Sequence, residues 1–222
     1  MNAINSIFRR PRVLLPVVHC CDPAQAAQQA DLARESGADG VFFINQGGMS
    51  GAQVARLARE YGLANRGWFV GVNLLGVVDS FKASTLIGSC ISGLWDDAWS
   101  DGPLNWSGAY FGGVAFKYQR PEVPPEKWGE AARAARDAGV AVVTTSGPAT
   151  GEPAPVEKAR AMRDALGHHA LALASGITPE NVGDFLPYVD AYLVATGIER
   201  SFGEFDASRL RALAEQIHTW RA

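Results

Sequence analysis

Two short steps in the last quarter of the sequence join a hydroxyl side chain to a glycine: Ser175-Gly176 and Thr196-Gly197. Each step follows an apolar run of the kind that forms a buried strand. Glycines let backbone N–H groups approach an anion, the hydroxyls can add hydrogen bonds, and a short helix beginning near Gly197 would direct its positive end at a phosphate. Matched steps after two successive strands therefore predict a phosphate-binding site, and the alternative is that both glycines only form tight turns.

Lys117 follows the apolar run 113–116, which predicts a strand that ends at this lysine. An ammonium group there could stabilise an oxyanion or phosphate, form a Schiff base, carry a proton, or only pair with Asp96 or Asp97. These two aspartates close an earlier strand, and neighbouring strand residues point to opposite sides. Asp96 is the candidate general acid or base if Trp95 faces outward, and the sequence does not decide which carboxylate faces inward.

His19, Asn45 and Asn73 end three other apolar runs. His19 is a candidate acid or base or a ligand contact, and the alternative is a core histidine with satisfied hydrogen bonds. The two amides could bind a sugar hydroxyl or carbonyl, or could tie down their own loops. Cys20-Cys21 would suit a soft metal, but no second Cys/His cluster has ligand spacing, so we predict no metal and no cofactor.

A stretch rich in hydroxyls and glycines, 144–153, begins at the end of the sixth predicted strand. Thr145 is a candidate ligand contact at the strand end. The loop that follows could fold over a ligand and bring Thr150 or Glu152 to it. The alternative is an ordinary flexible loop.

The elements that must position these residues follow a repeated pattern, in which short β-branched runs alternate with Ala-, Arg- and Glu-rich stretches of helical spacing. This alternation predicts βα units and a parallel sheet. Gly37, Gly62, Gly139 and Gly167 stand where helices should end, and Asp22-Pro23 and Thr178-Pro179 are typical helix starts. Strands are predicted at 13–19, 40–45, 69–75, 91–95, 111–118, 140–145, 170–175 and 192–196, and helices at 22–36, 51–61, 126–138, 156–166 and 178–188.

About eight such strands predict an α/β fold of the (β/α)8 TIM-barrel type, as a single domain over residues 1–222. An open doubly wound sheet is the alternative, but no G-x-G-x-x-G follows the first strand. Two stretches depart from the pattern: 95–110 has no visible helix, and the helix at 77–88 is weakly periodic. Barrel active sites lie at the carboxyl ends of the strands, where the candidate residues fall.

The charge, hydrophobicity and cysteine content of the sequence limit the kinds of partner that the protein can bind. A net charge of -3 with scattered lysines and arginines argues against nucleic acid binding. No apolar run is long enough to span a membrane and the first residues lack a signal peptide, so a cytoplasmic protein is expected. The 3 cysteines argue for reduced thiols rather than a disulfide framework. The tryptophan-rich loop 95–106 could be a partner surface, with a homo-oligomer as one option, or a lid.

The segment 146–153 (SGPATGEP), the segment 174–182 (ASGITPENV) and Ala195-Thr196-Gly197 resemble the BtpA-like family. A less specific similarity to the sequences of this family is found at Val18-His19, at the segments 37–40 and 71–75, and at Lys117. The family is similar to phosphoribosylanthranilate isomerase within the ribulose-phosphate-binding barrels. This resemblance implies a (β/α)8 barrel, a phosphate site and a polar mouth. Tyr118 departs from the histidine expected there. The implied phosphate residues are Ser175, Gly176, Thr196 and Gly197, and the implied mouth residues are His19, Asn45, Asn73 and Lys117.

BtpA-like proteins have been linked to photosystem I biogenesis and to nucleosidase activity. The resemblance therefore indicates the class of ligand more specifically than it indicates the reaction. The first hypothesis is an isomerase, lyase or nucleosidase-like enzyme that acts on a phosphorylated sugar or phosphoribosyl compound. The second is a non-catalytic barrel that binds such a ligand as an assembly or regulatory factor. A third is a Schiff-base aldolase that uses Lys117.

Overall fold

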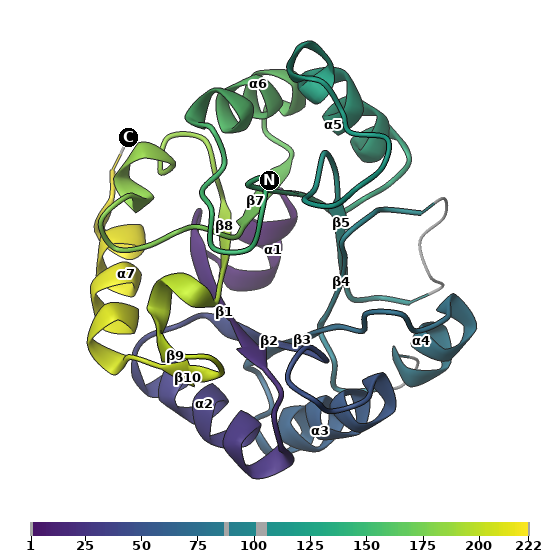
Figure 1. Cartoon of the computed structure of the whole chain (residues 1–222), viewed down its shortest axis with the longest axis vertical. Helices are drawn as coiled ribbons and strands as arrows, with labels where there is room; N and C mark the ends of the chain where they lie inside the picture. The colour runs from purple at the N-terminus through teal and green to yellow at the C-terminus, as the bar shows by residue number, and fades with distance from the viewer. Residues whose placement is uncertain (1, 87–88, 101–105, 222) are drawn as a thin grey trace.

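Eight parallel strands close into a barrel in the computed structural model, which describes residues 2–86, 89–100 and 106–221 (Figure 1). The ring closes where β1 pairs with β8, in a register that sets Val13 opposite Ala191. The predicted barrel is confirmed, and the open doubly wound sheet is excluded. The strands are β1 Val13–His19, β2 Gly40–Ile44, β3 Phe69–Asn73, β4 Gly93–Asp96, β5 Ala109–Gly113, β6 Val142–Ser146, β7 Ala170–Ala174 and β8 Ala191–Val194.

Helices surround the barrel, and one short helix closes its base. The base helix, α1, lies across the centre of the ring, where its Ile4 is fully buried and its Phe8 ring lies 4.9 Å from that of Phe69 (Figure 1). The described helices are α1 Ala3–Phe8, α2 Pro23–Glu35, α3 Gly51–Ala64, α4 Asp79–Leu86, α5 Trp128–Asp137, α6 Val156–Leu166 and α7 Ala207–Thr219. Shorter elements are the 3-10 turns η1 Pro125–Lys127, η2 Val182–Asp184 and η3 Thr196–Ile198 and the hairpin of β9 Glu199–Ser201 and β10 Glu204–Phe205. No described helix has the length and apolar character needed to cross a membrane.

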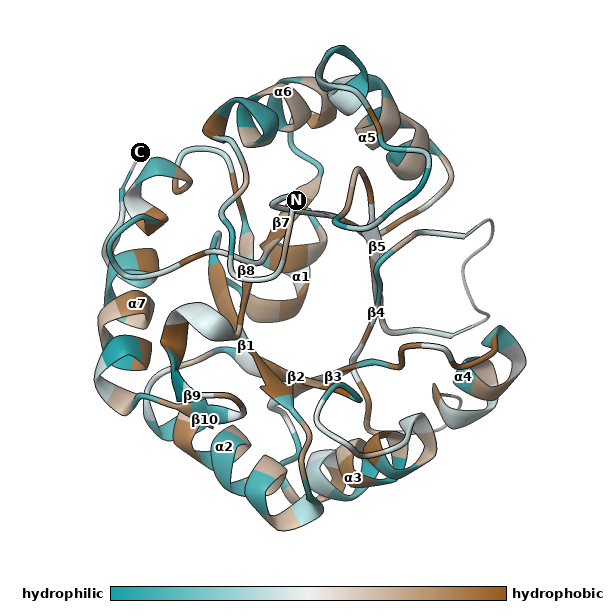
Figure 2. Cartoon of the chain, in the orientation of Figure 1, coloured by the Kyte–Doolittle hydropathy of each residue, from teal (hydrophilic) through white to brown (hydrophobic). Residues whose placement is uncertain are grey.

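Strand alternation divides the core into two layers, one inside the barrel and one between barrel and helices. On β1, for example, Val13 and Leu15 face the interior, whereas Leu14 and Val18 face the helices. The strands and the inward sides of the helices are apolar, and the outward sides of the helices are polar (Figure 2). This alternation decides which side chain at each strand end can reach the barrel mouth.

Several helix ends follow from local capping. Asp22 accepts hydrogen bonds at the start of α2, and Ser50 and Gln53 form a reciprocal capping box on α3. The prediction that a helix ends at Gly62 is wrong, because α3 runs to Ala64. A Cβ at position 62 would lie 2.8 Å from the carbonyl oxygen of Cys90, so close packing explains this glycine.

The predicted helix 178–188 is wrong, because only the 3-10 turn η2 forms there. The side chain of Asn181 accepts from the Thr178 N–H and donates to the Gly176 carbonyl. Such bonds between side chain and backbone compete with helical hydrogen bonds.

The predicted strand 111–118 is also corrected, since β5 ends at Gly113. The chain turns at Ala115, which has a φ of 48°, a conformation that a strand does not accommodate. Val114 and Phe116 are nevertheless buried, in the outer and inner layers of the core, which is why the apolar run continues past the strand. Lys117 therefore lies on a turn rather than at a strand end.

The fourth unit is as irregular as its sequence suggests. β4 spans 93–96 rather than 91–95, and the residues after it that the structure describes, 97–100 and 106–108, contain no helix. Positions 101–105 of the tryptophan-rich loop lie outside the described residues.

Candidate functional site

The carboxyl ends of the strands surround a cavity of about 160 Å³, which we call the mouth cavity. Apolar and polar side chains both line it, and several strand ends contribute one of each. Lys117, Thr150, Ser175 and Thr196, which follow β5, β6, β7 and β8, form what we call its polar wall. The apolar residues are Val17, Ile44, Leu75, Trp95, Leu193 and Ala195; the polar lining is His19, Gln46, Asp97, Lys117, Tyr118, Thr150, Ser175 and Thr196, with Gly151 between them.

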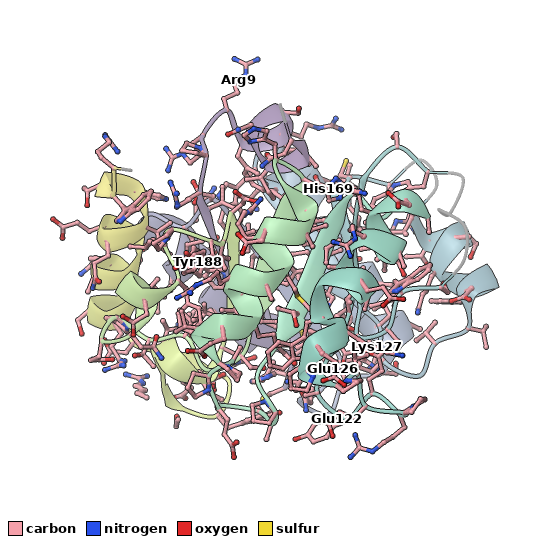
Figure 3. All side chains as sticks on the ribbon, turned by 90° about the horizontal axis from the view of Figure 1, so that it is seen from above. Arg9, Glu122, Glu126, Lys127, His169 and Tyr188 are labelled. Atoms are coloured by element: carbon pink, nitrogen blue, oxygen red, sulfur yellow. The ribbon has the colours of Figure 1, made fainter. Side chains whose placement is uncertain are left out.

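A larger hollow of about 610 Å³ lies at the opposite end of the barrel, beside α1, with Arg10 and Arg66 on its walls. In the side view of Figure 3, Arg9 marks this base and Glu122, on the loop after β5, marks the mouth end. Arg10 is already paired with Asp39 at 2.8 Å. Barrel active sites form at the strands' carboxyl ends, so we place the candidate site in the smaller cavity.

Lys117 lies at the centre of the polar wall. Its Nζ donates to Thr150 Oγ1 at 3.2 Å and to Ser175 Oγ at 3.2 Å. Its backbone N–H donates to Ser146 Oγ at 2.7 Å, which fixes the turn to the end of β6. Burial lowers the pKa of Lys117, and the nearby Asp97 carboxylate opposes that shift. The lysine thus offers a partly desolvated positive charge among hydroxyl groups.

Asp97, not Asp96, is the carboxylate in the mouth cavity. The Trp95 ring packs inside the barrel against Phe42 and Phe116, so the residue after it points outward. Asp96 accordingly forms an ion pair with Lys82 of α4, at 2.6 Å. The placement of Asp96 at the mouth was wrong because its condition, an outward Trp95, is not met.

Asn73 holds the mouth carboxylate in place. Its Nδ2 donates to Asp97 Oδ1 at 3.0 Å. Burial raises the pKa of Asp97, and the Asn73 hydrogen bond and the Lys117 charge partly offset that rise. Asp97 is therefore a carboxyl group whose proton affinity is increased, as a general acid or base requires.

His19 reaches the mouth cavity from the end of β1 and is paired with Glu199, which the sequence did not indicate. His19 Nδ1 lies 2.9 Å from Glu199 Oε1, and the N–H of Gly203 donates to the same oxygen at 3.0 Å. The Phe202 ring is stacked on the imidazole at 4.6 Å. No local spacing could reveal this pair, because 180 positions separate its members.

The hydroxyl residue and the glycine of each predicted phosphate step lie in different surroundings. Ser175 and Thr196 line the mouth cavity, whereas Gly176 and Gly197 are buried. A Cβ on Gly176 would lie 2.2 Å from the Pro153 nitrogen, and one on Gly197 would lie 1.8 Å from the Ile177 oxygen. Both glycines therefore let loops pack tightly behind the hydroxyls. Gly176 in particular lets the loop 147–153 pack against the residue that follows Ser175 at the end of β7.

Four other candidates lie outside the cavity lining. Asn45 is bonded on both sides of its amide to the backbone of Leu75, at 3.0 and 2.7 Å, so it ties β2 to the loop after β3. Thr145 is fully buried and its Oγ1 has no hydrogen-bond partner among the described residues. Glu152 is exposed. Asn73 acts on the site only through Asp97.

Lys158 of α6 is a buried cation that the sequence did not indicate. Its Nζ donates to the Ser146 carbonyl at 2.8 Å and to the Ala115 carbonyl. Burial lowers its pKa to about 8. Because Ala115 belongs to the turn that carries Lys117, and Ser146 accepts a hydrogen bond from the Lys117 N–H, this ammonium group fixes the backbone under the mouth lysine.

Within the described residues, no group of three or more His, Cys, Asp or Glu side chains is arranged to hold a metal ion. The three cysteines, Cys20, Cys21 and Cys90, are unbridged.

Comparison with known proteins identifies relatives by fold. No family model matches the sequence, and no curated protein matches it, so membership of the BtpA-like family is not confirmed. Phosphoribosyl anthranilate isomerase from Thermus thermophilus is similar in structure, with a TM-score of 0.67, 20% identity, and coverage of 95% of this chain and 100% of that one. These values establish a shared barrel fold.

Two further solved structures are similar over nearly their whole lengths. One is (S)-3-O-geranylgeranylglyceryl phosphate synthase from Thermoplasma acidophilum, in complex with its substrate sn-glycerol-1-phosphate (TM-score 0.68, 16% identity, 98% of this chain and 99% of that one). The other is 2-keto-3-deoxy-6-phospho-gluconate aldolase from Zymomonas mobilis (TM-score 0.66, 13% identity, 98% and 97%). All three have the same barrel as this chain.

Proposed function

We propose that this barrel binds a phosphorylated small molecule in its mouth cavity and catalyses a proton transfer on it, as an isomerase or a related lyase. The observation that carries this proposal is the position of Lys117 Nζ, 3.2 Å from each of two hydroxyls, Thr150 Oγ1 and Ser175 Oγ. A cation beside hydroxyl donors is an arrangement that suits a phosphate dianion.

Names of the structural relatives support the class of ligand. Each of the three names a phosphorylated compound: phosphoribosyl anthranilate, a glyceryl phosphate and a phospho-gluconate. The proposed phosphate donors in this chain are Ser175, Thr196, Thr150 and Lys117, while Gly176 and Gly197 allow the close packing behind them. Membership of the BtpA-like family is part of the same proposal, since its motifs include both steps.

Asp97 supplies the acid or base. Its raised pKa makes it able to hold a proton closer to neutral pH than an exposed aspartate does, and Asn73 fixes its orientation. The apolar side chains that line part of the mouth cavity reduce the contact of a bound ligand with water, which strengthens the electrostatic interactions of both charged groups.

Proton transfer can be tested without knowledge of the natural substrate. Candidate sugar phosphates are incubated with the protein in D2O, and NMR detects deuterium that enters the ligand. We expect exchange in the wild type and its loss in Asp97→Asn. Lys117→Met should weaken binding of the same compound by about 10- to 100-fold, because one charge-assisted contact is worth about 1.5–3 kcal/mol. Binding without any exchange or turnover would instead support a non-catalytic barrel.

A Schiff-base aldolase is a second candidate, favoured by one observation. Burial lowers the pKa of Lys117, which increases the fraction of neutral, nucleophilic amine. Borohydride added together with a carbonyl-bearing sugar phosphate would trap the imine as a covalent adduct on Lys117. Absence of an adduct, under conditions where the compound binds, removes this candidate.

A further inference from the structure

We propose that His19, oriented by Glu199, is a second proton carrier of the mouth cavity, on the side of the ligand away from Asp97. This inference rests on the proposed function and adds to it a catalytic pair. Glu199 is the positioning residue of the pair, and His19 the group that meets the ligand. The proposal follows from the geometry of the hairpin β9–β10 over the end of β1.

His19 and Glu199 are both buried, and their hydrogen bonds fix which imidazole nitrogen carries the proton. The side chains of His19 and Glu199 are only 5% and 6% exposed. The Gly203 N–H can only donate, and it shares Glu199 Oε1 with His19 Nδ1. We take that oxygen as the acceptor of both contacts, so Nδ1 carries the hydrogen.

The other ring nitrogen then has a free electron pair. Among the described residues no hydrogen bond reaches His19 Nε2, while His19 lines the mouth cavity. A histidine whose Nδ1–H is held by a carboxylate is oriented to take a proton at Nε2, and the carboxylate stabilises the imidazolium that results. An ordinary core histidine would not combine a buried ionisable partner with a free nitrogen on a cavity.

The hairpin β9–β10 supplies the residues that contact the His19 ring. It supplies Glu199 at one end, Gly203 in its turn, and Phe202 between them, whose ring stacks on the imidazole at an interplanar angle of 7°. Phe202 is itself 58% exposed, so it covers the ring from the solvent side of the hairpin. Its stacked ring keeps water away from the pair.

The position of the two carriers suits a proton relocation. His19 ends β1, whereas Asp97 follows β4, three strands further around the ring (Figure 1). In one direction, neutral His19 takes a proton from the ligand at Nε2, and protonated Asp97 gives one to another atom of the ligand. His19 then loses its proton to water and Asp97 regains one, so no net proton is consumed. The roles exchange in the reverse direction.

A second histidine–carboxylate pair in the chain serves as a comparison. His218 Nε2 lies 2.8 Å from Asp39 Oδ2, at the base of the barrel and away from the mouth cavity. Because the two pairs have the same chemistry and different surroundings, any effect of a mouth ligand should be confined to His19.

The first measurement is the tautomer of His19 in the free protein, from 15N NMR of the imidazole nitrogens. We expect the hydrogen on Nδ1 in the wild type, a shift toward the Nε2–H form in Glu199→Leu, and no change in Glu204→Gln. Glu204 is the matched control, since it lies on the same hairpin and its side chain bonds to Arg200 and Ser201 instead. A wild-type His19 with its hydrogen on Nε2 would overturn the inference.

The second measurement is deuterium exchange into a phosphorylated ligand. His19→Gln should lower kcat by about 100-fold or more, the usual contribution of a general acid or base, with little change in KM. Glu199→Gln should lower kcat by a smaller factor, and Glu204→Gln should leave it unchanged. Unchanged kcat in His19→Gln, with phosphate binding intact, defeats this inference alone. If neither inorganic phosphate nor any sugar phosphate binds, the proposed function fails, and this inference with it.

Discussion

Lys117 Nζ lies 3.2 Å from Ser175 Oγ, although 58 positions separate the two residues in the sequence. Neither residue belongs to a strand. Lys117 follows β5 on a turn in which Ala115 and Tyr118 have positive φ, and Ser175 follows β7 with a φ of 81°. Three non-glycine residues with strained backbone thus surround one contact, as is common where a site positions a group at the expense of local stability.

Ser175 is expected to lower the stability of the fold while it contributes to phosphate binding. Ser175→Gly relieves the positive φ and should leave the free energy of unfolding level or raise it by up to about 1 kcal/mol. The same change removes a hydroxyl from the mouth and should weaken phosphate binding by about tenfold or more. Ser175→Ala is the control, because it removes the hydroxyl without relieving the strain. Denaturant unfolding and calorimetric titration with phosphate measure the two effects, and unchanged affinity in both variants would count against Ser175 as a ligand contact.

The two adjacent aspartates should respond in opposite ways. Asp97→Asn removes a buried charge, so it should retain the stability of the wild type while it abolishes proton exchange into the ligand. Asp96→Asn breaks the ion pair with Lys82 and should lower the free energy of unfolding by about 1–3 kcal/mol with exchange retained. Loss of exchange in Asp96→Asn, in a protein shown to be folded, would contradict the assignment of the mouth carboxylate.

Gly176 should tolerate no side chain. Gly176→Ala places a Cβ 2.2 Å from the Pro153 nitrogen at a φ of 69°, so we expect a loss of about 3 kcal/mol or more and a displaced loop 147–153. Gly183→Ala is the matched control, since a Cβ at that position would have no described atom within 4 Å, and its stability should change by less than about 1 kcal/mol. Thermal unfolding of the two variants decides the matter; equal stabilities would mean that the loop does not pack on β7.

Lys158 should make stability depend on pH. Burial lowers its pKa to about 8, whereas an unfolded lysine has a pKa of about 10.4. Between these values the unfolded chain binds more protons than the folded chain, so the contribution of Lys158 to stability rises with pH across this window, by about 3 kcal/mol at most. A neutral amine still has two N–H groups for the Ala115 and Ser146 carbonyls.

The test compares unfolding free energies of wild type and Lys158→Met from about pH 7 to about pH 10. The wild type should gain on the variant as the pH rises. Lys127→Met, which removes an exposed lysine near the start of α5, should change the free energy of unfolding by less than about 0.5 kcal/mol. A constant difference between wild type and Lys158→Met over this range would show that Lys158 does not titrate there.

The barrel could be predicted from the sequence because each βα unit carries its own signals. The run 13–19 is apolar almost throughout because both faces of this strand are buried, and Asp22-Pro23 begins the next helix where the structure begins it. The prediction was wrong where tertiary contacts replace local ones. The run to Phe116 remains apolar because both core layers extend past β5, and Gly62 reflects packing against Cys90 rather than a helix end.

The site was predictable only in part, for a similar reason. Ser175, Thr196, Thr150, Lys117 and His19 could be placed at the mouth because each follows a strand or lies on the loop beside it. The choice between Asp96 and Asp97 depended on the side to which Trp95 points, which the inner core decides. Glu199 and Lys158 act through partners remote in sequence, so no spacing indicates them.

The central claim is that the polar wall of the mouth cavity binds phosphate, and a crystal structure of the protein soaked with inorganic phosphate tests it most directly. We expect density for the anion within hydrogen-bond distance of Ser175 Oγ, Thr196 Oγ1 and Lys117 Nζ. The same soak of Lys117→Met should leave this position weak or empty. Phosphate bound instead at the barrel base, between Arg10 and Arg66, or no phosphate in the mouth of the wild type, would contradict the claim.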